Sequence, residues 1–71
     1  MEKVTLDDLL EYGLTLTPLS VEGRKIVFLF LKTKEMKEDM IIFLLRHKEA
    51  TGQEIMNELG RLIEENKKTT E

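Results

Sequence analysis

The sequence predicts an all-α fold with three to four short helices in a compact bundle. Apolar residues recur three and four positions apart between Ile55 and Ile63, the spacing of one helix face. Threonines stand at positions 5, 33 and 51, each just before a segment with helical character, where a hydroxyl can cap a helix. With 71 residues, we expect one helical domain over residues 1–66 and a flexible polar tail over 67–71.

The first helix is expected from Leu6 to Tyr12. Thr5 can accept a hydrogen bond from a free amide, and the carboxylate of Asp8 falls in the first turn, where the helix dipole favours it. Gly13 follows at the position where many helices end on a left-handed residue. We therefore expect Gly13 to terminate this helix.

The segment from Leu14 to Thr33 fits two structures. As a helix, it would take Thr17 as its cap and Pro18 as its first residue, although Gly23 counts against a helix. As a β-hairpin around residues 14–31, it would use an alternating first strand and a second strand rich in β-branched and aromatic residues. The helix is the first choice, and the hairpin would make the fold α+β.

Two further helices follow. Thr33 can cap a helix from Lys34 to about Lys48, and Thr51 with Glu54 forms a capping box ahead of the last helix. That last helix carries a narrow apolar stripe made of Ile55, Met56, Leu59, Leu62 and Ile63.

The chain carries more apolar surface than a small bundle can cover. Residues 40–45 are apolar at six successive positions, hence around the whole circumference of a helix, and residues 26–31 form a second such run. Either the two runs bury one another within one chain, or a second chain covers them. The second option predicts a homodimer with a two-fold interface, to which we assign Phe28, Phe30, Ile42 and Phe43.

Several classes of site are not expected from this composition. The chain has no cysteine and one histidine, so we predict no metal site, no cofactor and no catalytic residues. His47 stands at a helix end, where a cation interacts favourably with the dipole. Asp7, Asp8 and Glu11 are explained by the amino-terminal end of the first helix. We therefore expect a protein that is not an enzyme.

A DNA-binding regulator of helix-turn-helix type is the alternative. The helix from Lys34 and the residues that follow it resemble the first two helices of small winged-helix regulators, although the chain then lacks room for a recognition helix and wing. Residues 51–68 fit the motif poorly, because Met56 and Asn66 stand where a small and an apolar residue belong. The net charge of −3 also disfavours nucleic acid. The contacts would come from Arg24, Lys25, Lys32, Lys34 and Lys37.

The expected function is that of a small intracellular protein–protein interaction or regulatory module. It would act as a homodimer and bind an unidentified protein. Neither apolar run approaches the roughly 20 residues needed to cross a bilayer, and the first residues do not resemble a secretory signal, so we expect no membrane partner. The absence of cysteine fits a reducing compartment, which predicts a cytoplasmic location.

Overall fold

A computed structural model describes residues 3–69, with side chains to residue 67, and confirms the all-α prediction. Four helices follow one another along the chain: α1 (Leu6–Thr15), α2 (Val21–Phe30), α3 (Lys34–Arg46) and α4 (Gly52–Thr69). No strand occurs among residues 3–69, so the alternative with a hairpin around residues 14–31 is wrong.

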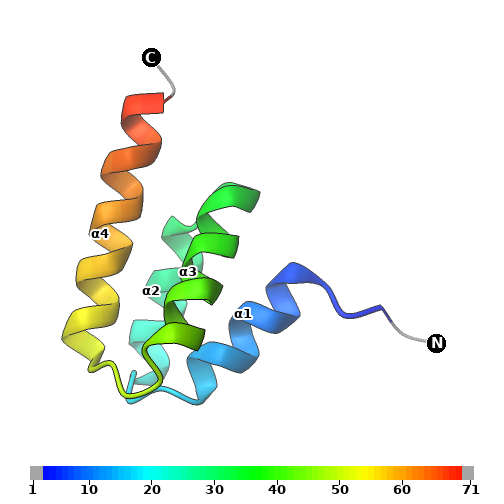
Figure 1. The fold of residues 1–71 in the computed structure, drawn as a ribbon. Coiled ribbons are helices and arrows are strands. Elements are labelled where there is room, and N and C mark those ends of the chain that lie inside the picture. The colour runs from blue at the N-terminus through cyan, green and yellow to red at the C-terminus, as the bar shows by residue number, and fades with distance from the viewer. Residues whose placement is uncertain (1–2, 70–71) are drawn as a thin grey trace.

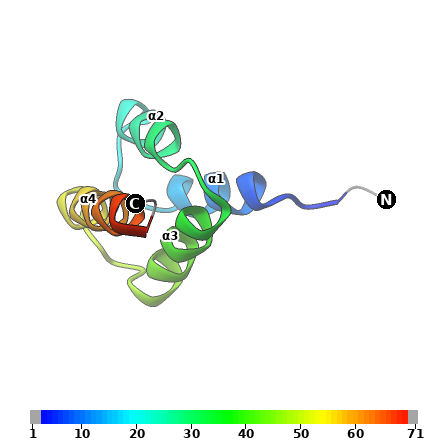
Figure 2. The same ribbon diagram turned by 90° about the horizontal axis from the view of Figure 1, so that it is seen from above.

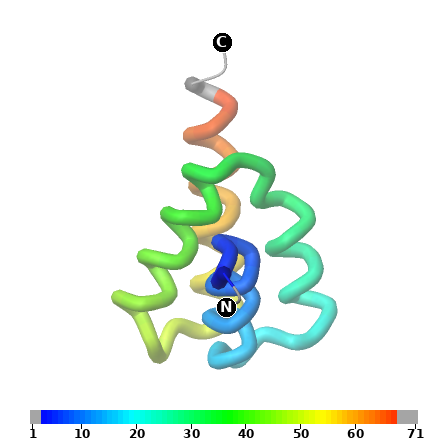
Figure 3. The backbone as a smooth tube through the Cα atoms, turned by 90° about the vertical axis from the view of Figure 1, so that its right-hand side faces the viewer, coloured from blue at the N-terminus to red at the C-terminus, as the bar shows by residue number. Residues whose placement is uncertain are grey.

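The helices form a ring of neighbours rather than a stack. Helix α1 packs against α2 and α3, and α4 packs against the same two helices from the other side. Figure 3 shows α1 in front, α4 behind, and α2 and α3 to either side. Seen from above, α1 runs across the directions of the other three helices (Figure 2). The carboxyl-terminal part of α4 extends beyond the ends of α2 and α3 (Figure 1).

Helix starts follow the capping residues closely. In α1 the hydroxyl of Thr5 accepts from the amide of Asp8, and the Asp8 carboxylate accepts from the amide of Thr5. The hydroxyl of Thr33 accepts from the amide of Met36 at 3.1 Å. Thr51 and Glu54 exchange the same pair of bonds at the start of α4. The predicted capping positions of these three helices are confirmed.

The predicted end of α1 is wrong. The helix continues through Gly13 to Thr15 instead of ending at Tyr12, and Gly13 does not take a left-handed conformation. The reason for a glycine here is a close approach between helices: a Cβ at this position would lie 3.2 Å from Cδ1 of Leu44 in α3. Gly13 therefore serves the packing of α1 against α3 rather than the termination of α1.

Helix α2 is confirmed as a helix, but its predicted start is wrong. Ser20 caps it by accepting from the amide of Gly23 at 3.0 Å, and Val21 is its first residue. Thr17 instead donates its hydroxyl to the carbonyl of Leu14, and Pro18 lies in the connection between α1 and α2. Ser20 rather than Thr17 is the cap because its hydroxyl accepts a hydrogen bond from a free backbone amide in the first turn of the helix, that of Gly23.

The second half of the chain agrees more closely with expectation. Helix α3 ends at Arg46 rather than at Lys48, with His47 as its carboxyl-terminal cap residue. Helix α4 runs without a break through Gly60, which is exposed and has no neighbouring atom where a Cβ would stand. The expected tail at residues 67–71 starts within α4, and residues 70–71 lie outside the described part.

The core is entirely apolar within the described residues, with contributions from all four helices and from two connections. Val27 and Leu31 point inward from the first apolar run, and Met40 and Leu44 from the second. The buried set is Leu10, Leu14, Val27, Leu31, Met36, Met40, Leu44, Ala50, Ile55, Leu59 and Leu62. Because no described side chain is both polar and buried, packing and helix caps together account for the fold.

Two glycines of this fold should respond oppositely to the same substitution. Gly13→Val places branched carbons against Leu44, and we expect it to lower the free energy of unfolding by about 1–3 kcal/mol. Gly60→Val adds a side chain in open space and relieves the entropic cost of a glycine inside a helix, so the free energy of unfolding should stay equal or rise slightly.

Urea unfolding followed by circular dichroism measures both variants. Gly60→Ala, with the higher helix propensity, should raise the free energy of unfolding by about 0.5–1 kcal/mol. Equal losses at positions 13 and 60 would contradict the assignment of Gly13 to the contact between α1 and α3.

Candidate interaction surface

An apolar groove lies between α1 and α3, with a volume of about 520 Å³. We call this the α1–α3 groove. It is lined by Leu9, Tyr12, Gly13, Leu16, Thr17, Ile41, Leu44, Leu45 and Lys48. Four of these side chains remain largely in solvent: Leu9 is 49% exposed, Tyr12 and Leu16 are each 66% exposed, and Leu45 is 65% exposed. Such a concentration of exposed apolar side chains is typical of an interaction site.

The floor of the groove depends on the contact at Gly13. Because Gly13 has no side chain, Leu44 can pack against the α1 backbone, and the outer side chains of the two helices stand as walls on either side. Toward the start of α1, Asp7 forms an ion pair with Lys37 of α3 at 2.8 Å. These two contacts show that successive residues of α1 meet successive residues of α3 in the same order, 7 with 37 and 13 with 44, although the axis of α1 crosses that of α3 (Figure 2).

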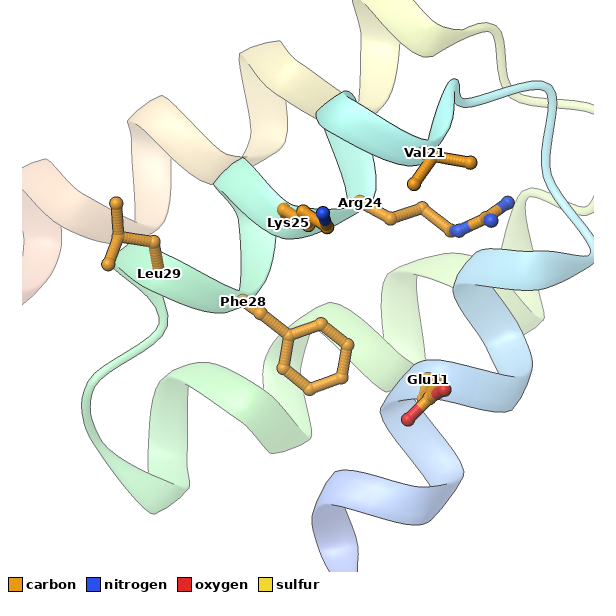
Figure 4. A pocket seen from close by; sticks show the side chains of 6 residues that line it. All are labelled: Glu11, Val21, Arg24, Lys25, Phe28 and Leu29. Carbon is orange, nitrogen blue, oxygen red and sulfur yellow. The ribbon is translucent and has the colours of Figure 1, made fainter.

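A second, shallower recess lies beside α2 (Figure 4). It is lined by Glu11 of α1 and by Val21, Arg24, Lys25, Phe28 and Leu29 of α2. In the figure, the ring of Phe28 lies between α2 and α1, while Leu29 stands at the end of the recess away from Val21. Leu29 is 62% exposed, so apolar surface is also available here, mixed with two cationic side chains.

The four interface residues expected from the sequence do not gather on one face. Phe28 lines the recess beside α2, whereas Ile42 and Phe43 line one depression between α3 and α4. Phe28 and Phe43 are partly buried against the core. Phe30 and Ile42 are each 45% exposed. The two apolar runs are thus only partly covered within one chain, as the sequence suggested, but the richest exposed surface lies elsewhere.

The basic residues proposed for nucleic-acid contact are distributed over three segments. Arg24 and Lys25 belong to the recess beside α2, and Lys32 and Lys34 flank the start of α3, where both are exposed. Lys37 is engaged in the ion pair with Asp7. One of the five cations is therefore already matched by a carboxylate.

A polar seam joins the outer sides of α3 and α4. The ring of His47 lies 4.6 Å from that of Phe43, centroid to centroid, and both line depressions that also include Glu58 and Arg61. Arg61 donates to Glu58 and to Glu65, and these hydrogen bonds and charges raise the pKa of the guanidinium above its usual value. Within the described residues, no group of three or more metal-ligating side chains comes together.

The groove could have been found from the sequence only with the correct end of α1. Leu9, Tyr12 and Leu16 are spaced three and four residues apart, which places them on one helix face. Ending the helix at Tyr12 removes Leu16 from that face and hides the pattern. The spacing of these residues therefore indicates the groove face only when the helix is extended beyond Gly13.

Comparisons with known protein families, with curated proteins and with solved structures gave no match to this chain. Among the described residues, none of the helices is both long and apolar enough to pass through a bilayer.

The capping box of α4 should make stability depend on pH. Hydrogen bonds from the Thr51 backbone amide and side chain, followed by the charge of His47, lower the pKa of Glu54 below 4.5. A carboxyl with a lowered pKa in the folded state stabilises the fold above its unfolded pKa, and this contribution disappears as the pH falls through the folded pKa. Glu54→Gln should thus be less stable than the wild type at pH 7.

The difference in the free energy of unfolding between the wild type and Glu54→Gln should shrink as the pH is lowered below about 4.5. Urea unfolding at several pH values measures this difference. Gln keeps an oxygen acceptor for the cap but carries no charge. Glu38→Gln, at an exposed position of α3, is the control for the general effect of removing a carboxylate. A Glu54→Gln deficit that persists undiminished at low pH would contradict the role of the ionised cap.

Proposed function

We propose that this chain is a small protein–protein interaction or regulatory module that acts in the cytoplasm as a homodimer. The observation that carries the proposal is the amount of apolar surface left uncovered by one chain. Among the residues that the structure describes, ten large apolar side chains are at least 41% exposed.

The distribution of these side chains supports binding rather than chance exposure. Single exposed apolar residues are normal on any protein, whereas a contiguous group marks a contact surface. Here four of the ten line one groove. In addition, the apolar run in α3 is exposed to solvent at Ile42 and Leu45, because helices on two sides cannot cover its full circumference.

Several acidic side chains serve structural contacts. Asp8 and Glu54 act as helix caps, Asp7 pairs with Lys37, and Glu58 pairs with Arg61. We therefore propose no catalysis. Nucleic-acid binding through the exposed basic residues of α2 and of the connection to α3 is the second candidate, favoured by Arg24 and Lys25 standing together at the recess beside α2.

Sedimentation equilibrium from low micromolar to near-millimolar concentration tests the proposal. We expect a reversible monomer–dimer equilibrium that persists in high salt, since apolar contacts are insensitive to screening. A monomer over the whole range would overturn the homodimer.

Retention on heparin separates the two candidate functions. Binding to phosphate or sulfate groups weakens steeply with salt, and a nucleic-acid binder should be retained at low salt and lose retention in the double variant Arg24→Glu/Lys25→Glu. Weak retention that this double variant does not change is the result expected for the interaction module.

A further inference from the structure

We infer that the α1–α3 groove is the dimer interface, and that its occupant is the same groove of a second copy, related by a two-fold axis. This inference rests on the proposed homodimer and adds which surface associates and in what orientation. The exposure of the groove, the charges near its two ends and its size support this inference.

Exposure distinguishes the α1–α3 groove from the other apolar surfaces. Leu9, Tyr12 and Leu16 form a continuous stripe along α1, and Leu45 faces them from α3. In the recess beside α2, by contrast, Val21 and Leu29 are separated by Arg24 and Lys25 along the same helix. A partner that desolvates the groove meets one charged lining residue, Lys48, which stands at its edge.

The exposed charges nearest to the two ends of the groove are opposite. Asp8 stands directly before Leu9 at the start of α1; it is exposed, and one of its carboxylate oxygens, Oδ2, accepts the capping hydrogen bond from the Thr5 amide. Lys48 lines the other end, next to Leu16 and Thr17, because successive residues of α1 meet successive residues of α3 in the same order. Lys48 forms no ion pair with another described residue.

A groove with an acidic residue near one end and a basic residue at the other can pair with an identical groove rotated by 180°, because each acidic residue then approaches a basic one. A two-fold axis through its centre sets the second copy antiparallel, so that each Lys48 approaches the other copy's Asp8. The two α1 helices then also run antiparallel, which opposes their dipoles favourably. A parallel arrangement would place like charges together at both ends.

The size of the groove sets the expected affinity. From Leu9 to Leu16 the α1 wall extends over roughly 10 Å at 1.5 Å per residue, and α3 contributes a shorter wall from Ile41 to Leu45. Such a surface falls at the small end of specific interfaces, where total buried areas below about 1,200 Å² are associated with weak or transient complexes. We therefore expect a dissociation constant in the micromolar range.

The chain offers a closely matched pair of substitutions for the test. Leu45 and Leu29 are both helical leucines with nearly equal exposure, 65% and 62%, but Leu45 lines the α1–α3 groove and Leu29 lines the recess beside α2. Because both side chains lie largely in solvent, a glutamate at either position should leave the fold intact, and circular dichroism checks this directly.

Sedimentation equilibrium of the two variants gives the result. We expect Leu45→Glu to raise the dissociation constant at least about tenfold, which corresponds to 1.4 kcal/mol, and Leu29→Glu to leave it unchanged. If the wild type dimerises but Leu29→Glu weakens the dimer as much as Leu45→Glu or more, the groove assignment is overturned while the homodimer stands. If the wild type stays monomeric, both fail.

The absence of native cysteine makes the orientation testable by disulfide trapping. In the antiparallel arrangement, Leu9 of one copy lies near Leu16 of the other, whereas in a parallel one each residue meets its own copy. Purified Leu9→Cys and Leu16→Cys proteins are mixed under mild oxidation. A mixed disulfide should form faster than either homodisulfide, since bridging requires Cα atoms within about 7 Å.

Two outcomes would overturn the two-fold antiparallel groove. The first is predominance of the Leu9→Cys and Leu16→Cys homodisulfides. The second is equally fast trapping of a Leu29→Cys control, which would mean that disulfide formation follows random collision rather than a defined interface.

Discussion

The arrangement of the helices depends on the close contact between α1 and α3 at Gly13. With no side chain at this position, Leu44 packs directly against the α1 backbone, at a distance that leaves little room for even a Cβ. Together with the ion pair between Asp7 and Lys37, this contact fixes both the direction of α1 along α3 and its register. The buried Leu10 and Leu14 are thereby directed into the core, and Leu9, Tyr12 and Leu16 are directed to the groove.

The same contact explains why apolar surface accumulates on this side of the molecule. Helix α1 is apolar on two faces, and the bundle needs only one of them. Helix α3 has the same property: Met40 and Leu44 point inward, while Leu45 lies at the outer wall of the groove. Since α1 and α4 are its only packing partners within the described residues, no further helix is present to cover that wall. The apolar faces of α1 and α3 that the bundle does not bury thus meet along the α1–α3 groove.

The features that could be predicted from the sequence are those governed by neighbouring residues. The capping boxes at Thr5 and Thr51 and the cap at Thr33 each need a partner three residues away, so their chemistry is visible locally. The continuity of α4 through Gly60 also followed, because the apolar stripe keeps its helical spacing on both sides of the glycine.

The features that could not be predicted depend on contacts between distant segments. Gly13 resembles a helix terminator when only its neighbours are considered, and its true reason, Leu44, lies thirty-one positions away. The interface residues Phe28, Phe30, Ile42 and Phe43 stay a prediction, which rests on their place in strongly apolar runs. Hydrophobicity alone does not say which face of a helix turns inward, and the packing of α3 buries part of Phe43 against the core while leaving Leu45 in solvent.

In the proposed dimer, folding and association would be coupled. Among the described residues, the core is built from eleven buried apolar residues, and α1 holds its place through two of them, Leu10 and Leu14, together with the contact at Gly13. A second copy seated in the α1–α3 groove would cover the outer face of α1 and bind only the folded chain, so it would stabilise the fold by mass action. In the proposed dimer, the exposed stripe on α1 would thus add to the stability of the fold. Because the contacts of that dimer would involve α1 and α3, the recess beside α2 and the outer face of α4 would remain accessible.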